Sequence, residues 1–209
     1  MDRIKKEKNS NRILALTGVS AVLLFAALLF CVLADHTSGF DDPVRSFFYN
    51  LRCDALTPAV KAVTYMGNWQ SITALCIALL LIKPTRITYG IPVSAGAIFV
   101  TVLNKLIKAA VQRPRPDDVI HLISEGGFSF PSGHSITSMF VFGLLICLVR
   151  SNVRNKTAAN VLTAVLRIPM ILIGLSRIYL GVHYPTDVLA GWCLGIAVTA
   201  AVIGIKRIF

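Results

Sequence analysis

The sequence has few charged residues, and few of those are acidic. Of its 209 residues 15% are charged, and 10 Asp and Glu stand against 21 Lys and Arg, giving a formal net charge of +11. Soluble domains have about a quarter charged residues, so an ordinary soluble globule is excluded. A hydrophobic content of 55% also excludes a disordered chain. The composition indicates a polytopic membrane protein whose basic residues should be distributed unevenly between its loops.

The sequence also lacks internal repeats, low-complexity segments and long linkers, so we expect residues 1–209 to form a single domain. Its five cysteines include no C-x-x-C pair and four lie in apolar segments, which argues against a disulfide framework. The basic residues are not interleaved with aromatic ones, so we expect no nucleic-acid binding. Asp117-Asp118 and Glu125 are interpreted as a solvated loop rather than a metal site. We therefore expect no metal, no cofactor and no obligate protein partner.

Six apolar segments are candidates for membrane-spanning helices, which need about 20 apolar residues each. They are Ile13–Ala34, Trp69–Ile82, Ile87–Ile107, Ser132–Val149, Leu166–Leu180 and Asp187–Ile205. The second and fifth are short and follow weakly polar helical stretches, Thr57–Met66 and Thr157–Val165, that either extend the spans or lie at the interface. The pattern predicts an all-α fold, a bundle of six transmembrane helices.

A further segment, Asp41–Cys53, lies between the first two spans. It places Val44, Phe47, Phe48 and Leu51 at helical spacing, and its opposite face is polar. This pattern predicts a short amphipathic helix along the bilayer surface, with a solvated loop as the alternative.

The distribution of Lys and Arg predicts the orientation. With the N-terminus inside, the inner segments hold twelve bases and two acids, whereas the outer segments hold eight of each; Arg167, in or beside span five, completes the excess of eleven. Cytoplasmic loops are enriched in Lys and Arg, so both termini, including the tail 1–12, should be cytoplasmic. The protein is expected in the cell (inner) membrane.

On this layout, polar residues gather at the outer ends of spans three to six, although such residues are costly in a membrane. Lys108–Pro116 follows span three, Phe130–Ser135 begins span four, and Ser176–Asp187 joins spans five and six. Three segments that are far apart in the sequence therefore meet at one membrane face.

Each of these segments suits an anionic ligand for a physical reason. Arg113 and Arg115 precede prolines, which disfavour helical backbone, so span three should end near Gln112. Their guanidinium groups match phosphate oxygens. At Pro131–His134 a serine can cap a helix whose N-terminal amides attract anions. His183 and Asp187 are four residues apart, so one helical turn would let Asp187 hold one ring nitrogen while the other acts as a nucleophile.

Taken singly, each segment also has a structural explanation. The arginines could snorkel to the interface, Pro-Ser-Gly could be an ordinary helix start, and either histidine could make a structural hydrogen bond. Their convergence on one face favours a functional site.

Together these residues resemble the motifs of the type 2 phosphatidic acid phosphatase superfamily of integral membrane lipid phosphatases. The motif Lys-x6-Arg-Pro falls on Lys108, Arg115 and Pro116, Pro-Ser-Gly-His falls on Pro131 to His134, and Ser-Arg-x5-His-x3-Asp falls on Ser176, Arg177, His183 and Asp187. All three match without substitution and in the family's order, within residues 108–187.

The resemblance implies a metal-independent phosphatase that works through a phosphohistidine. It implies that His183 is the nucleophile, Asp187 its orienting partner and His134 the general acid. The phosphate would be bound by Lys108, Arg115, Ser132, Gly133 and Arg177. Arg113 lies outside the fixed positions of the motif, so its role stays open.

The implied substrate is a lipid phosphate, processed at the outer (extracytoplasmic) membrane face among membrane lipids. Isoprenoid (undecaprenyl) pyrophosphate is the first candidate, because small bacterial members resemble this chain in size; phosphatidylglycerophosphate, phosphatidate and lipid A phosphates remain open. An anion transporter or channel is the alternative, although it should distribute charges through the membrane depth. Vanadate-dependent haloperoxidases share the motif set, but they are soluble.

Overall fold

The structure, a computed structural model, describes residues 2–117 and 120–208, and every regular element in these residues is helical. Asp118, assigned above to a solvated loop, lies outside the described residues. The elements are α1 (Asp2–Leu33), α2 (Ser38–Asn50), α3 (Leu56–Tyr65), α4 (Trp69–Leu81), α5 (Lys83–Thr85), η1 (Arg86–Gly90), α6 (Ile91–Val111), α7 (Gly133–Asn152), α8 (Lys156–Tyr179) and α9 (Pro185–Ile208).

Five helices in the described part of the chain are long and apolar enough to cross a membrane. Their apolar stretches are Asn9–Leu33, Lys83–Val111, Gly133–Asn152, Lys156–Tyr179 and Pro185–Ile205. The remaining predicted span forms α4, a shorter apolar helix of 13 residues. Such a helix is about 20 Å long, less than the roughly 30 Å hydrocarbon core, so the predicted count of six is approximate.

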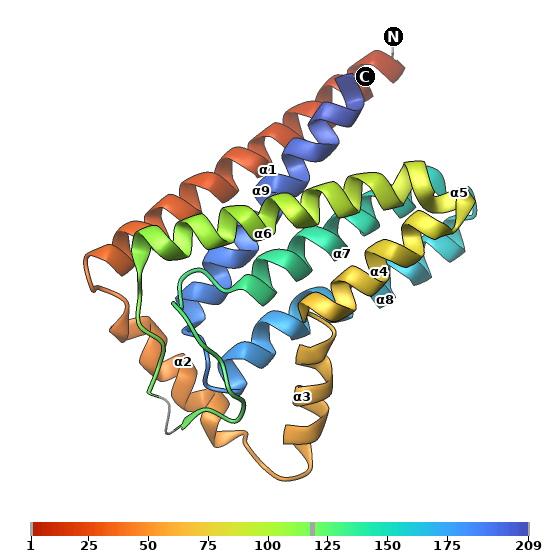
Figure 1. The fold of residues 1–209 in the computed structure, drawn as a ribbon. Coiled ribbons are helices and arrows are strands. Elements are labelled where there is room, and N and C mark those ends of the chain that lie inside the picture. Colours follow the sequence, from red (N-terminus) through yellow and green to blue (C-terminus); the bar gives the residue numbers. More distant parts are fainter. Residues whose placement is uncertain (1, 118–119, 209) are drawn as a thin grey trace.

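The structure also shows how each of the two weakly polar stretches is related to the span that follows it. Thr157–Val165 lies within α8 and lengthens the predicted fifth span. Thr57–Met66 instead lies mostly in a separate helix, α3, and a turn at Gly67 and Asn68 connects α3 to α4. Figure 1 shows α3 pointing away from the bundle at a clear angle to α4. The protein is a multi-pass membrane protein with additional short helices at one end.

Helix α7 lies at the centre of the bundle and packs against α6, α8 and α9, while α1 packs along α9 (Figure 1). Phe140 and Leu144 of α7 are fully buried, as are Val100 of α6 and Ile173 of α8. In contrast, α1 exposes large apolar side chains such as Leu23 and Phe30. Because exposing such side chains to water is unfavourable, these surfaces are suited to contact lipid.

Two small residues let α9 approach α7 closely. Gly191 and Gly195 are one helical turn apart, and a Cβ on either would lie within 3 Å of atoms of α7 or of the residue before it. Small residues at this spacing are a common means of close helix contact in membranes. The approach brings the start of α9 beside the start of α7, where the amide of Ser132 donates a hydrogen bond of 3.0 Å to the carbonyl oxygen of Asp187.

The two termini lie at one end of the molecule, and α2, α3 and the loop between α6 and α7 lie at the other (Figure 1). The predicted amphipathic segment is helical, but α2 begins at Ser38 and ends at Asn50, three residues earlier at each end than expected. Its polar face is not simply directed at solvent, because Asp41 is 1% exposed. Phe40 and Phe47 are exposed on the same helix.

Candidate active site

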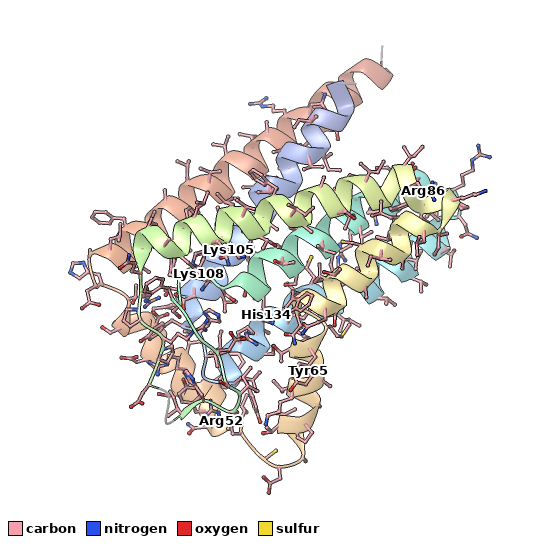
Figure 2. The ribbon with its side chains drawn as sticks, viewed as in Figure 1. Arg52, Tyr65, Arg86, Lys105, Lys108 and His134 are labelled. Carbon is pink, nitrogen blue, oxygen red and sulfur yellow. The ribbon has the colours of Figure 1, made fainter. Side chains whose placement is uncertain are left out.

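The polar residues singled out in the sequence converge at the end of the bundle that is remote from the termini. Lys108 lies near the end of α6 and His134 near the start of α7, next to the loop that joins these helices (Figure 2). Arg177 lies near the end of α8, and His183 and Asp187 lie at the start of α9. Contacts described below connect all of these segments, so the predicted convergence is found in the structure.

His183 and Asp187 are in contact, although not in the predicted way. His183 precedes α9, which begins at Pro185, so a turn at the helix start rather than a helical turn brings the two side chains together. Nδ1 of His183 lies 3.3 Å from Oδ2 of Asp187. The same carboxylate oxygen accepts hydrogen bonds from the Tyr184 amide at 2.9 Å and from the Ser129 hydroxyl at 2.5 Å. These neighbours favour the tautomer of His183 that has its proton on Nδ1 and a lone pair on Nε2.

The free nitrogen of His183 faces a cation. Nε2 lies 3.2 Å from Nη1 of Arg115, which also donates to the carbonyl oxygen of Val182 at 2.7 Å. Arg115 is held by further hydrogen bonds to the carbonyl oxygens of Gly126 and Gly127. Its guanidinium group is therefore fixed beside the nitrogen that would attack a substrate.

Two more cations complete this cluster. Lys108 donates to the carbonyl oxygens of Phe128 and Ser129. Arg177 is fully buried and donates to the hydroxyl of Thr64 on α3 at 2.8 Å. Its Nε has no hydrogen-bond partner within the described residues. A buried donor without a partner is unfavourable, so this nitrogen is available to an anion.

A carboxylate already lies between the two arginines. Glu125 pairs with Arg177, and its other oxygen lies 3.6 Å from Nη2 of Arg115. The interpretation of Glu125 as part of a solvated loop is therefore wrong, because its charge is opposed by both arginines and its side chain is only 26% exposed. Asp117 of the same predicted loop is exposed.

The start of α7 is built as the sequence predicts. Ser132 is the N-cap residue, and its hydroxyl oxygen accepts a long hydrogen bond from the Ser135 amide and a shorter one from the Ser135 hydroxyl. Gly133 opens the helix beside the Asn104 amide, which would lie 3.0 Å from a Cβ at this position. Similarly, α6 ends at Val111, as the Arg-Pro sequence predicts, and Gln112 follows it in the left-handed conformation.

His134 lies beside the cluster and has its own partner. Its Nε2 lies 2.8 Å from Oδ1 of Asn68, so this nitrogen donates a hydrogen bond to the amide oxygen. Arg177, His183, Arg115 and Lys108 all act electrostatically on the ring. Nδ1 remains the nitrogen of His134 that can serve proton transfer.

Burial, followed by the positive charges of Arg115, Lys108 and Arg177, lowers the pKa of His183 well below its ordinary value of 6.5. The contact with Asp187 would by itself raise this pKa, but Oδ1 of Asp187 is paired with Arg113 at 2.7 Å. The carboxylate charge is thus already compensated. His183 is neutral at physiological pH, and its contact with Asp187 is a hydrogen bond rather than an ion pair.

A mostly apolar groove on the side of the bundle reaches the site at His134. It has a volume of about 540 Å³ and lies between α4, α6 and α7. Trp69, Ile98 and Val102 line its outer part, and Gly133 and His134 line its inner end. The groove therefore places an apolar environment directly next to a titratable group.

Several residues of the site were not identified from the sequence. Ser129 contacts both His183 and Asp187. Thr64 accepts a hydrogen bond from Arg177, and Asn68 accepts one from His134. Asp41 is buried against Arg113. Asn68 did give a signal, because it precedes an apolar helix in the position of a cap. In the structure its side chain makes no capping hydrogen bond to α4 and binds His134 instead.

Comparisons with known proteins identify the family of the chain. The family model "PAP2 superfamily" matches residues 89–207. The chain is 27% identical over 188 residues to phosphatidylglycerophosphatase B of Bacillus subtilis, covering 85% of this chain and 89% of that protein. It is 37% identical over 147 residues to decaprenylphosphoryl-5-phosphoribose phosphatase of Mycobacterium tuberculosis, covering 68% and 76%.

The fold is also similar to a solved structure. The crystal structure of a transmembrane PAP2-type phosphatidylglycerolphosphate phosphatase from Bacillus subtilis superimposes with a TM-score of 0.83 at 25% identity. The match covers 92% of this chain and 97% of that one.

Proposed function

Since this chain belongs to the PAP2 superfamily and is a membrane phosphatase, we propose that it hydrolyses a lipid phosphate or pyrophosphate through a phosphohistidine intermediate. The observation that supports this most directly is the surrounding of Nε2 of His183. A neutral imidazole with its lone pair on Nε2 faces Arg115, and Lys108 and Arg177 lie around the same space. Phosphoryl transfer is catalysed chiefly by positioning and by stabilising the charge on the phosphoryl oxygens.

In the first step, Nε2 of His183 attacks phosphorus and the bond from phosphorus to the leaving oxygen breaks. His134 acts as the acid in its charged form, with a proton on each ring nitrogen: it gives its Nδ1 proton to that oxygen and becomes neutral, while the Nε2 proton keeps the hydrogen bond to Asn68. In the second step, His134 accepts a proton from water, whose oxygen attacks the phosphohistidine and releases phosphate. Asp187 orients His183 and stabilises the positive charge that its ring acquires.

The phosphate would be bound by the side chains of Lys108, Arg115 and Arg177 and by the N-terminal end of α7, at Ser132 and Gly133. A helix N-terminus attracts anions through its free amides and its dipole. These groups can neutralise a phosphate without a metal ion, so we propose a metal-independent reaction. Residues 108–187 would then be the catalytic region of a single domain.

The groove between α4, α6 and α7 favours a lipid over a water-soluble substrate. An apolar chain in this groove would lie in the membrane region and end next to His134, which is where the leaving oxygen must be protonated. A sugar phosphate offers no apolar surface to fill this space, and burying apolar chain surface contributes about 25 cal/mol per Å².

The charge distribution supports a site on the extracytoplasmic side of the cell membrane with both termini in the cytoplasm. The termini lie at the end of the molecule opposite to the candidate site (Figure 1). A reporter fused after Phe209 tests this orientation. Activity of a reporter that functions only outside the cytoplasm would overturn it.

The substrate is tested by phosphate release from purified protein in detergent. The panel holds undecaprenyl pyrophosphate, phosphatidylglycerophosphate and phosphatidate, with glucose 6-phosphate as the water-soluble comparison and His183→Ala as the inactive control. We expect release from at least one lipid and the highest kcat/KM with the isoprenoid pyrophosphate. Equal turnover of glucose 6-phosphate would contradict a lipid phosphatase, and preference for a glycerophospholipid would correct the substrate alone.

A further inference from the structure

Arg113 occupies a position that the phosphatase motifs leave unassigned, yet it is one of the most extensively bonded side chains in the site. Its Nη1 donates to Oδ1 of Asp187 at 2.7 Å and to the Thr186 hydroxyl at 2.8 Å. Its Nη2 donates to Oδ2 of Asp41 and to the Thr37 hydroxyl, both at 2.8 Å. One guanidinium group therefore joins α2 to the start of α9.

The partners of Arg113 are buried and bound to one another. Asp41 is 1% exposed and Asp187 is fully buried. Asp41 also accepts hydrogen bonds from the amide of Thr186 at 2.9 Å and from its hydroxyl at 2.8 Å. The face of the guanidinium lies 3.9 Å from the ring centre of Tyr184. The arrangement leaves little freedom for the Asp187 carboxylate.

The two oxygens of Asp187 have different partners as a result. Oδ1 accepts from Arg113, whereas Oδ2 accepts from Ser129 and Tyr184 and lies 3.3 Å from the ring of His183. An Asp187 without Arg113 could rotate about its side-chain bonds and would be an uncompensated charge beside an imidazole. A small displacement of an orienting group is sufficient to slow a reaction.

We infer that Arg113 and Asp41 are positioning residues for the reaction: Arg113 divides its charge between Asp41 and Asp187, which fixes the Asp187 carboxylate toward His183. This inference rests on the proposed function, because His183 must be the reacting group. It also makes α2 a contributor to the site rather than only a helix at the bilayer surface.

The inference predicts charge effects of opposite sign. Loss of the Arg113 charge leaves Asp187 uncompensated, so protonation of His183 becomes easier and its pKa rises. Loss of the Asp41 charge leaves all of the Arg113 charge to Asp187, so the pKa of His183 falls. The other charged or titratable groups around this ring stay the same in both variants: Lys108 of α6, Arg115 and Glu125 of the loop, His134 of α7 and Arg177 of α8.

The experiment compares Arg113→Gln, Arg113→Lys and Asp41→Asn with the unchanged protein. Asp42→Asn is the matched control, because it removes the same charge from the adjacent residue of α2, where Asp42 is 62% exposed and pairs with Arg45 at 3.2 Å. The first readout is kcat and KM for the best lipid substrate as a function of pH. The second is the pKa and tautomer of His183 from ¹⁵N-histidine NMR in micelles, where a chain with four histidines gives few signals.

We expect Arg113→Gln to lower kcat about 10- to 100-fold with KM nearly unchanged, because a displacement of about 1 Å in a catalytic geometry can cost about 100-fold. The pKa of His183 should rise by about one unit, the lower end of the effect of a nearby carboxylate, and should fall in Asp41→Asn. Arg113→Lys should keep the pKa but lose part of kcat, because an ammonium group cannot bridge both carboxylates as a guanidinium does. Asp42→Asn should change neither.

Shifts of the same sign in Arg113→Gln and Asp41→Asn, or no shift in either, would overturn the inference. A higher KM without a change in kcat would also overturn it, since Arg113 would then bind the phosphate. The NMR measurement needs no turnover, so it tests the arrangement even if the unchanged protein releases phosphate from none of the lipids. An absence of phosphate release would contradict the proposed function, whereas the NMR result would still decide whether Arg113 and Asp41 control the charge at His183. Because removing one partner of a buried ion pair is destabilising, kcat is expressed per folded molecule after size-exclusion chromatography.

Discussion

Replacing Glu125 by glutamine should strengthen the binding of inorganic phosphate. The carboxylate of Glu125 pairs with Arg177 and lies 3.6 Å from Arg115, so it takes the place that a phosphate would need between these arginines. A phosphate must displace it to occupy the space between the two arginines, although Nε of Arg177 already lacks a partner. Glutamine has nearly the same shape but no charge, so it should be displaced more easily.

The structure sets the size of this effect. A hydrogen bond to a charged group contributes about 1.5–3 kcal/mol. The Glu125 side chain is 26% exposed, so solvent weakens the pair with Arg177 and the lower end of this range applies. The contact with Arg115 is longer than a hydrogen bond and adds little. Since about 1.4 kcal/mol corresponds to a factor of ten, phosphate should bind about tenfold more tightly to Glu125→Gln.

The assay is product inhibition, which gives the inhibition constant of inorganic phosphate during lipid hydrolysis. The control is Asp54→Asn, which removes an exposed negative charge from the segment between α2 and α3. This control should leave the constant unchanged if the effect of Glu125 is local. An unchanged or higher inhibition constant in Glu125→Gln would refute the displacement argument. A loss of kcat at constant phosphate affinity would instead place Glu125 in the chemical step.

Three further outcomes test the site. His183→Ala should reduce phosphate release by several orders of magnitude in a folded, membrane-inserted protein, and near-normal release would remove this residue as the nucleophile. Activity should persist in excess EDTA, because Lys108, Arg115 and Arg177 supply the positive charge; a loss that Mg²⁺ restores would contradict this. Burial among cations lowers the pKa of His183 well below 6.5, so this histidine becomes protonated only at a pH lower than that. The fall of kcat/KM on the acid side that is due to His183 should therefore lie below pH 6.5, and a fall at or above pH 6.5 would contradict this reasoning.

Much of the fold could be predicted from the sequence because its main signals are local. Apolar runs predict membrane helices, Arg-Pro predicts the end of α6 near Gln112, and Ser132 predicts the start of α7. The sequence also predicted which residues come together in the site, because the order of the spans places the three motif segments at the same membrane face. The length of α4 was less certain, because the hydropathy of a segment does not fix where a helix turns.

The contacts that could not be predicted are those between segments far apart in the sequence. Asp41 is 72 residues from Arg113 and 146 from Asp187, and nothing local distinguishes it from the exposed Asp42 beside it. The sequence predicts an amphipathic helix here, but not that Asp41 packs against the start of α9. Glu125 was misread for the same reason: a glutamate in a glycine-containing loop is typical of solvated surface unless a buried arginine lies opposite.

The three acids that contact the site's arginines therefore belong to two kinds of pair, and the difference has a functional consequence. Asp41 and Asp187 are almost completely buried around Arg113, where removing either partner leaves an uncompensated charge, so this pair can maintain geometry. Glu125 is partly exposed and lies in a loop, so it can leave Arg177 at a lower cost. A balance of eight acids and eight bases on the outer segments thus does not mean that the cations are neutralised for a ligand. Arg113 stays paired with Asp41 and Asp187, whereas movement of Glu125 alone opens the space between Arg115 and Arg177 to a ligand.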